Sequence, residues 1–132
     1  MKVVGLDHFV LTVRSIPETV AFYERVLGMA AMRFGEDRWA LRFGPHKINL
    51  HQVDRTFEPK ALRPTMGSGD LCFLVDSLEG IEAHLAACGI AILVERSGRS
   101  GARGPITSVY IRDPDENLIE LSVYDDGTKA AS

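Results

Sequence analysis

Residues 6–28 read LDHFVLTVRSIPETVAFYERVLG, and residues 69–89 read GDLCFLVDSLEGIEAHLAACG. Each stretch begins with a strand-like pattern and continues into a run with helical spacing that ends at a glycine. An offset of 62 residues aligns the two beginnings, so that His8 matches Asp70 and Ser15 matches Ser77. The same order of elements is therefore written twice, which indicates a duplicated unit.

The two helices carry recognisable start and stop signals. Ser15 is the expected N-cap of the first, with Pro17 in its first turn, and Gly28 ends it. Ser77 is the expected N-cap of the second, which Gly89 ends. Both runs are amphipathic, so each helix is expected to pack on a sheet. The expected apolar stripes are Ile16, Val20, Tyr23 and Leu27 in the first helix, and Leu78, Ile81, Leu85 and Cys88 in the second.

Three strand-like runs follow each helix, with glycine- and proline-containing turns between several of them. Each half is therefore expected to be βαβββ, with modules at 3–53 and 69–124, a linker at 54–68, and one domain over 1–132. This element order predicts an α+β fold in which two curved sheets form a cleft with helices outside. The expected strands are 29–34, 38–43 and 47–52 in the first half, and 91–94, 107–112 and 117–123 in the second.

Composition narrows the function classes. The 132 residues are 45% apolar and 25% charged, which is typical of a globular protein and excludes disordered or collagen-like chains. The net charge of −3 argues against a general nucleic-acid binder, and no apolar run approaches the length of a membrane span. Cys72 and Cys88 lie inside expected elements, and the N-terminus shows no signal peptide pattern, so a cytoplasmic location is expected.

Strand alternation places one ionisable residue from each of four strands on the face away from the helices. Burying two imidazoles and two carboxylates together is costly unless a cation compensates. This donor set suits divalent Fe, Mn, Ni, Co or Zn. Asp70 begins its strand, so a turn-capping role is its alternative. The four residues are His8, His51, Asp70 and Glu120.

Three further residues are candidate substrate contacts. Asn49 is expected on the same strand face as His51. Tyr110 is expected on the same strand face as Ser108 and Arg112, where it could reach the substrate. The alternative for Tyr110 is a core or edge position. Arg103 lies in the segment 96–104, which holds three arginines and three glycines and is interpreted as a substrate lid. A solvated loop is the alternative for this segment.

Three stretches carry a family resemblance: DHFVLTV at 7–13, FYERVLGM at 22–29 and RDPDENLIEL at 112–121. They resemble the vicinal oxygen chelate superfamily of glyoxalase I, extradiol dioxygenases, and fosfomycin- and bleomycin-resistance proteins. FEPK at 57–60 and GARGPI at 101–106 resemble the glyoxalase domain-containing protein 5 group.

The resemblance implies metal ligands at His8 and Glu120. Bacterial glyoxalase I has Glu and His where this chain has His51 and Asp70, so the places of imidazole and carboxylate are exchanged here. His8, His51 and Glu120 still make a two-histidine, one-carboxylate ligand set, and Glu120 or Asp70 is the candidate base.

The expected function is a metal-dependent lyase, isomerase or dioxygenase that chelates a small oxygen-rich substrate. A metal-free binding protein of the bleomycin-resistance type is the alternative, and a subunit with a vestigial site is a third reading. The resemblance also implies a homodimer.

Overall fold

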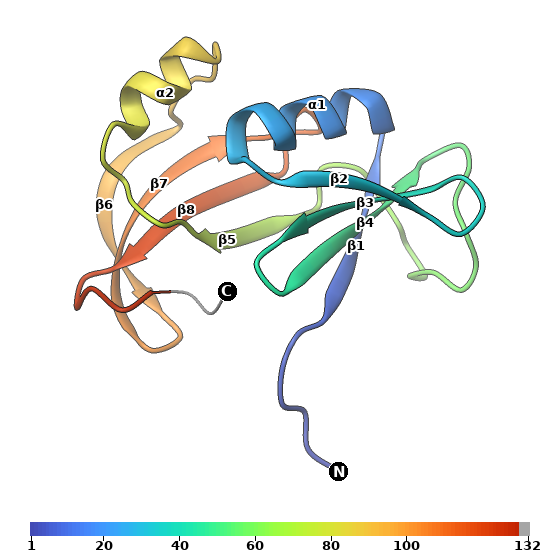
Figure 1. The fold of residues 1–132 in the computed structure, drawn as a ribbon, viewed down its shortest axis with the longest axis horizontal. Coiled ribbons are helices and arrows are strands. Elements are labelled where there is room, and N and C mark those ends of the chain that lie inside the picture. Colours follow the sequence, from blue (N-terminus) through green and yellow to red (C-terminus); the bar gives the residue numbers. More distant parts are fainter. Residues whose placement is uncertain (130–132) are drawn as a thin grey trace. The chain divides into compact units, whose positions relative to one another are not determined.

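The computed structural model describes residues 1–129 and divides the chain into two compact units. The first unit is residues 1–66, and the second begins at Gly67. Each unit contains a four-stranded mixed sheet and one helix, as the βαβββ repeat predicts, and neither sheet closes into a barrel (Figure 1). No helix of residues 1–129 is long and apolar enough to cross a membrane.

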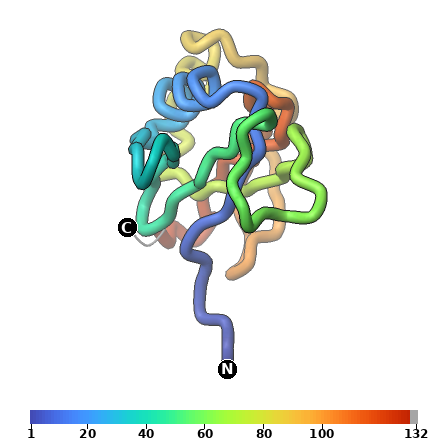
Figure 2. Tube along the Cα trace, turned by 90° about the vertical axis from the view of Figure 1, so that its right-hand side faces the viewer, coloured from blue at the N-terminus to red at the C-terminus, as the bar shows by residue number. Residues whose placement is uncertain are grey.

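The sheet of the first unit has the order β1-β4-β3-β2. Its outer strand β1 runs parallel to β4, and the remaining neighbours are antiparallel. Residues 1–7 precede β1 outside any strand and extend away from the sheet (Figure 2). The elements are β1 (His8–Val13), α1 (Ile16–Leu27), β2 (Ala30–Phe34), β3 (Arg38–Phe43) and β4 (His46–Gln52).

The ends of α1 are those that the sequence predicts. The Ser15 hydroxyl accepts a hydrogen bond from the amide of Glu18, and Pro17 lies in the first turn. Gly28 ends the helix in the left-handed region at φ 67°, where a residue without Cβ is unstrained.

The buried face of α1 differs from the expected apolar stripe. Of that stripe only Tyr23 is buried, and the others are partly exposed. The helix instead buries Thr19, Phe22, Tyr23 and Val26. The remaining core of this unit comes from alternate residues of the strands, which include Leu11, Leu41, Ile48 and Leu50.

The second unit repeats the topology with the strand order β5-β8-β7-β6, and β5 runs parallel to β8. A buried polar turn joins β7 to β8. Asp113 accepts hydrogen bonds from the backbone amide and the side-chain amide of Asn117, and Asn117 accepts one from the amide of Gly69. This network ties the start of β8 to the residue before β5. The elements are β5 (Asp70–Leu74), α2 (Ile81–Ala87), β6 (Val94–Gly101), β7 (Gly104–Arg112) and β8 (Leu118–Tyr124).

Three local expectations in this unit are wrong: a loop at 96–104, a strand at 91–94 and Ser77 as the N-cap of the second helix. Most of the segment 96–104 belongs to β6 and the rest to the turn and the start of β7, and the strand expected at 91–94 begins only at Val94. An edge strand has only one neighbour, so its polar residues remain exposed and its sequence reads as a loop. Helix α2 begins after Gly80, because the Ser77 hydroxyl accepts a hydrogen bond from Glu79 within the preceding turn.

Candidate functional site

Both expected histidine ligands of the first unit lie on the same face of its sheet. In the parallel pair of β1 and β4, His8 is opposite Lys47 and Thr12 is opposite His51. Trp39, which shares a pocket with residues of α1, is paired with Leu50 and therefore faces the other way. His8 and His51 thus lie on the face that α1 does not cover, as strand alternation predicts.

The register does not bring the two histidines to adjacent positions. Four residues separate the row of His8 from the row of His51, which is about 13 Å along the strands. Asn49 lies in the row between them, opposite Val10. Its side chain is buried, and its Oδ1 atom has no hydrogen-bond partner within residues 1–129. Asn49 is therefore nearer than His51 to the row of His8.

His51 is a buried imidazole without hydrogen bonds. Its residue is 2% exposed, and its ring meets that of Phe57 edge to face at a centroid distance of 5.5 Å. Neither ring nitrogen has a partner in the described part of the chain. Burial lowers the pKa of His51, and the charges of Arg38 and Lys60 lower it further. His51 is therefore neutral near pH 7, the form in which imidazole binds metals or accepts protons.

His8 is more open than His51. Its side chain is 45% exposed, and Nδ1 lies 2.7 Å from Oδ1 of Asp7. The hydrogen bond to His8 is the main cause that lowers the pKa of Asp7. A carboxylate on one ring nitrogen orients an imidazole and leaves its other nitrogen available to a ligand.

In the second unit, Glu120 is held by a chain of hydrogen bonds. The Ser108 hydroxyl donates to Oε2 of Glu120 at 2.6 Å, and the Ser122 oxygen lies 2.7 Å from that of Ser108. The Cys72 sulfur lies 3.2 Å from the Ser122 oxygen. Each hydroxyl has one proton, so Ser122 must donate to Ser108 and the Cys72 thiol to Ser122. Burial is the main cause that raises the pKa of Cys72, which agrees with a protonated thiol.

Tyr110 and Asp70 share the face of Glu120. Tyr110 is opposite Glu120 in the pair of β7 and β8, and Cys72 is opposite it in the pair of β5 and β8. Burial raises the pKa of Tyr110, and a hydrogen bond to Glu120 adds to the effect. Asp70 lies two residues before Cys72 on the same face and is exposed.

Arg103 is placed in the short turn between β6 and β7. Its backbone amide donates to the hydroxyl of Tyr124 at 3.1 Å, and its guanidinium carbon lies 4.5 Å from the centre of that ring. This turn is closed by the pairing of Gly101 with Gly104. Arg103 is thus at the tip of a hairpin.

Neither unit, within the described residues and taken singly, groups three His, Cys, Asp or Glu side chains that could hold a metal ion.

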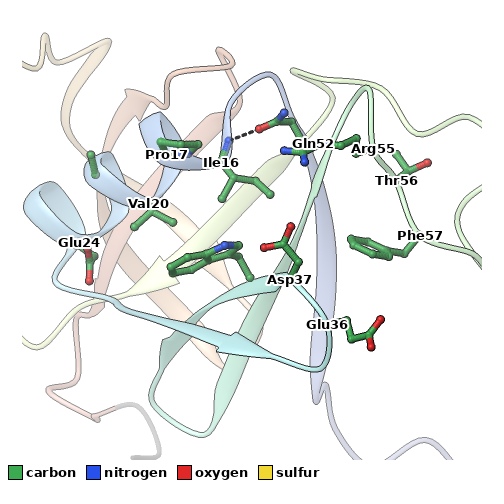
Figure 3. Close-up of a pocket in the computed structure, with 12 residues that line it drawn as sticks. Ile16, Pro17, Val20, Glu24, Glu36, Asp37, Gln52, Arg55, Thr56 and Phe57 are labelled. Atoms are coloured by element: carbon green, nitrogen blue, oxygen red, sulfur yellow. Dashed lines mark hydrogen bonds between the residues drawn. The ribbon is translucent and has the colours of Figure 1, made fainter.

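A separate pocket of about 680 Å³ lies beside α1 in the first unit (Figure 3). Ile16 and Val20, two members of the expected stripe, line it together with Trp39 and Phe57. Gln52 lies at this pocket and accepts a hydrogen bond from the amide of Ile16 (Figure 3). None of the expected site residues lines it.

The sequence interpretation missed Arg38, Phe57, Ser108 and Ser122. The parity of β3 relative to β4 would have placed Arg38 on the histidine face, since Ala40 is opposite Asn49. The two serines share a face with Glu120, a signal that alternation already contained. Phe57 lies outside the regular strands, so no periodicity could have placed it.

The glyoxalase/bleomycin resistance protein/dioxygenase superfamily matches residues 5–121. The chain belongs to this superfamily. Virulence protein STM3117 of Salmonella typhimurium is 52% identical over 120 residues, which cover 90% of this chain and 83% of that protein. Its crystal structure matches with a TM-score of 0.92 at 50% identity, over 94% of this chain and 99% of that one.

Two further proteins extend the comparison. The glyoxalase domain-containing protein RDO1 of Mycosarcoma maydis is 51% identical over 127 residues, covering 96% of this chain and 72% of that protein. The fosfomycin resistance protein FosX of Listeria monocytogenes, solved with Mn(II) and sulfate, has a TM-score of 0.66 at 18% identity, over 93% and 92% of the two chains. That likeness concerns the fold.

Proposed function

We propose that this superfamily member is a metal-dependent enzyme that acts on a small oxygen-rich molecule, as a lyase, isomerase or dioxygenase. One observation carries the proposal: both ring nitrogens of His51 are buried without a partner. Leaving a buried polar atom unpaired costs about 1–3 kcal/mol, so such atoms in a native protein usually have a ligand or function. The neutral form of His51 is the form that a divalent cation binds.

The donor set fits a divalent transition metal. His8 and Glu120 are the proposed ligands, each already oriented by a neighbour, Asp7 and Ser108 respectively. His51 is the proposed third ligand. Because four residues separate its row from that of His8, the Asn49 oxygen is the alternative third donor. Imidazole and carboxylate ligands suit Fe, Mn, Ni, Co or Zn.

When bound, the metal would act as a Lewis acid toward two neighbouring oxygens of the substrate. The protein's own residues would handle the proton. Asp70, exposed on the face of Glu120, is the proposed base. Tyr110 is a phenol whose pKa is raised further by burial, so it is protonated near pH 7 and is the proposed hydrogen-bond donor to the substrate.

The separation of His8 from His51 favours a second candidate, a metal-free protein that binds and sequesters a small molecule. The two candidates differ in metal content. FosX, which shares the fold, was solved with Mn(II).

Elemental analysis of the untagged, full-length protein separates the candidates. We expect about one divalent transition metal per chain, and we expect His8→Ala and Glu120→Gln to lose it. His51→Ala and Asn49→Ala then identify the third donor. His84→Ala, an exposed change on α2, is the matched control and should retain the metal. Full occupancy in both the His8 and Glu120 variants would overturn the ligand assignment.

We also propose a homodimer, in line with the superfamily resemblance. Val3, Val4 and Leu6 are 82%, 95% and 59% exposed in the segment before β1, so they offer apolar surface to a second copy. Sedimentation velocity at micromolar concentration should show a dimer. A monomer throughout that range would contradict this proposal.

A further inference from the structure

The guanidinium of Arg38, on the histidine face of the first sheet, lies over two aromatic rings. Its guanidinium carbon lies 5.1 Å from the ring centre of Phe34 and 4.6 Å from that of Phe57. Phe34 is its direct partner in the pair of β2 and β3, and Phe57 is the residue that packs against His51. Two such contacts restrict the positions of the guanidinium, whose N–H groups point outward in its plane and can donate hydrogen bonds.

Within residues 1–129, no carboxylate forms an ion pair with Arg38, and no hydrogen bond satisfies its five N–H donors. Arg33 provides the contrast. It also stacks on a ring, that of Trp39 at 5.5 Å, but pairs with Asp37 at 3.0 Å. A partly buried guanidinium that is positioned and left unpaired is the arrangement that binds an incoming anion.

Arg38 and the charged side chains around it together carry a net positive charge. The Lys47 ammonium lies 4.0 Å from the centre of the Phe34 ring, on which Arg38 also stacks. The charges of Lys60 and Arg38 both act on His51. The opposing carboxylates are Glu58, which lies 3.3 Å from Lys60 and is 76% exposed, and Asp7, which is 88% exposed and interacts with the charge of Lys47. His51 itself offers two buried ring nitrogens that have no hydrogen-bond partner within residues 1–129.

We propose that Arg38 is the anion anchor of this face and binds a carboxylate or phosphate group of the ligand. The planar fork of a guanidinium matches either oxyanion in a bidentate manner, and the flanking lysine charges favour its approach. That this anion belongs to the substrate of the same site rests on the proposed function, whereas the anion site itself does not. The ligand would thus be a small molecule with both a chelating oxygen pair and a separate negative group.

The test uses inorganic phosphate and acetate as probes of the two oxyanions, each titrated at low salt into the full-length protein as purified. In the wild type, the Arg38 Nε–Hε signal in ¹⁵N NMR reports binding, and the backbone amide signals of Phe34 and Phe57 give the affinity in wild type and variants alike. We expect at least one probe to shift this signal, and its affinity to fall at least tenfold in Arg38→Gln. Arg33→Gln, the ring-stacked arginine of the opposite face, should retain affinity within twofold. The probe that binds more tightly identifies the oxyanion.

Equal affinity of wild type and Arg38→Gln for both probes, or no shift of the Arg38 signal, would overturn the proposal. If Arg38→Gln does not fold, Arg38→Lys takes its place, since it keeps the charge but loses the fork and should still weaken binding severalfold. A second titration after dialysis against EDTA removes any contribution of a metal. Arg38-dependent binding that persists there supports the anchor even if the metal assignment fails.

Discussion

The Ser108 hydroxyl donates a hydrogen bond of 2.6 Å to Oε2 of Glu120, and Ser108 itself is completely buried. Glu120 is the candidate ligand and Ser108 the group that fixes one of its oxygens. The same hydroxyl accepts a hydrogen bond from Ser122, so Ser108 is part of a row of hydrogen-bonded side chains on this face of the second sheet. These hydrogen bonds therefore couple the orientation of the Glu120 carboxylate to the stability of this sheet.

Replacing Ser108 with alanine should lower the free energy of unfolding by about 1–3 kcal/mol, because Ser122 loses its acceptor and Glu120 its donor. Urea denaturation measures the change. Ser100→Ala, on the exposed edge strand β6, is the control and should stay within about 0.5 kcal/mol of wild type. Equal stability of the two variants would show that the buried chain contributes nothing to folding.

The same Ser108→Ala change should weaken metal binding about 10–100-fold, the usual effect of removing a group that orients a ligand. Mn(II) titration followed by electron paramagnetic resonance measures the affinity directly. Glu120→Gln should lose binding altogether, whereas Ser100→Ala should not change it. An unchanged affinity in Ser108→Ala would mean that Glu120 needs no fixed orientation or is not a ligand.

The turn between β7 and β8 should be sensitive to a single amide. Asn117 is 1% exposed, donates to Asp113 at 2.8 Å and accepts from the Gly69 amide at 2.7 Å. Asn117→Ala leaves the Gly69 amide without its acceptor and removes one donor from Oδ2 of Asp113, so it should cost about 2–4 kcal/mol in the free energy of unfolding. Glu116→Asn is the control. Glu116 has φ 65°, a conformation that asparagine tolerates, so the free energy of unfolding of Glu116→Asn should not fall below that of wild type. A loss below 1 kcal/mol in Asn117→Ala would be inconsistent with the network.

Alternation along the strands made most of the architecture predictable. The buried Ile48 and Leu50 and the opposite-facing Asn49 and His51 follow directly from a period of two in β4. The capped ends of α1 followed from Ser15 and Gly28, because their signals are local. Element order and these local signals together were sufficient for the fold class.

The features that the sequence did not reveal depend on contacts between distant residues. Arg96 of the polar edge strand β6 binds Glu82 of α2, and no pattern within 94–101 contains that partner. Phe57 reaches Arg38 and His51 from outside the strands, so the anion anchor could not be inferred before the chain was folded. The four-residue offset of His8 and His51 depends on register, which the sequence of either strand alone does not specify.

The ion pair of Glu82 and Arg96 should make stability depend on pH in the acidic range. Arg96 donates to both carboxylate oxygens, at 2.7 and 2.9 Å, and to the carbonyl of Leu78, which attaches the edge strand to the region of α2. The hydrogen bonds from Arg96 lower the pKa of Glu82 from 4.5 to about 2. Because the folded pKa lies below the unfolded one, the stabilisation is complete above about pH 4.5 and is lost as the pH falls toward 2. The free energy of unfolding of wild type should therefore exceed that of Glu82→Gln above pH 4.5, and the two should converge near pH 2.

Urea denaturation across this pH range measures the difference between wild type and Glu82→Gln. The control is Glu36→Gln, on the β2–β3 turn, whose difference from wild type should change little with pH. A Glu82→Gln difference that stays constant down to pH 2 would mean that the pair seen here does not persist in solution.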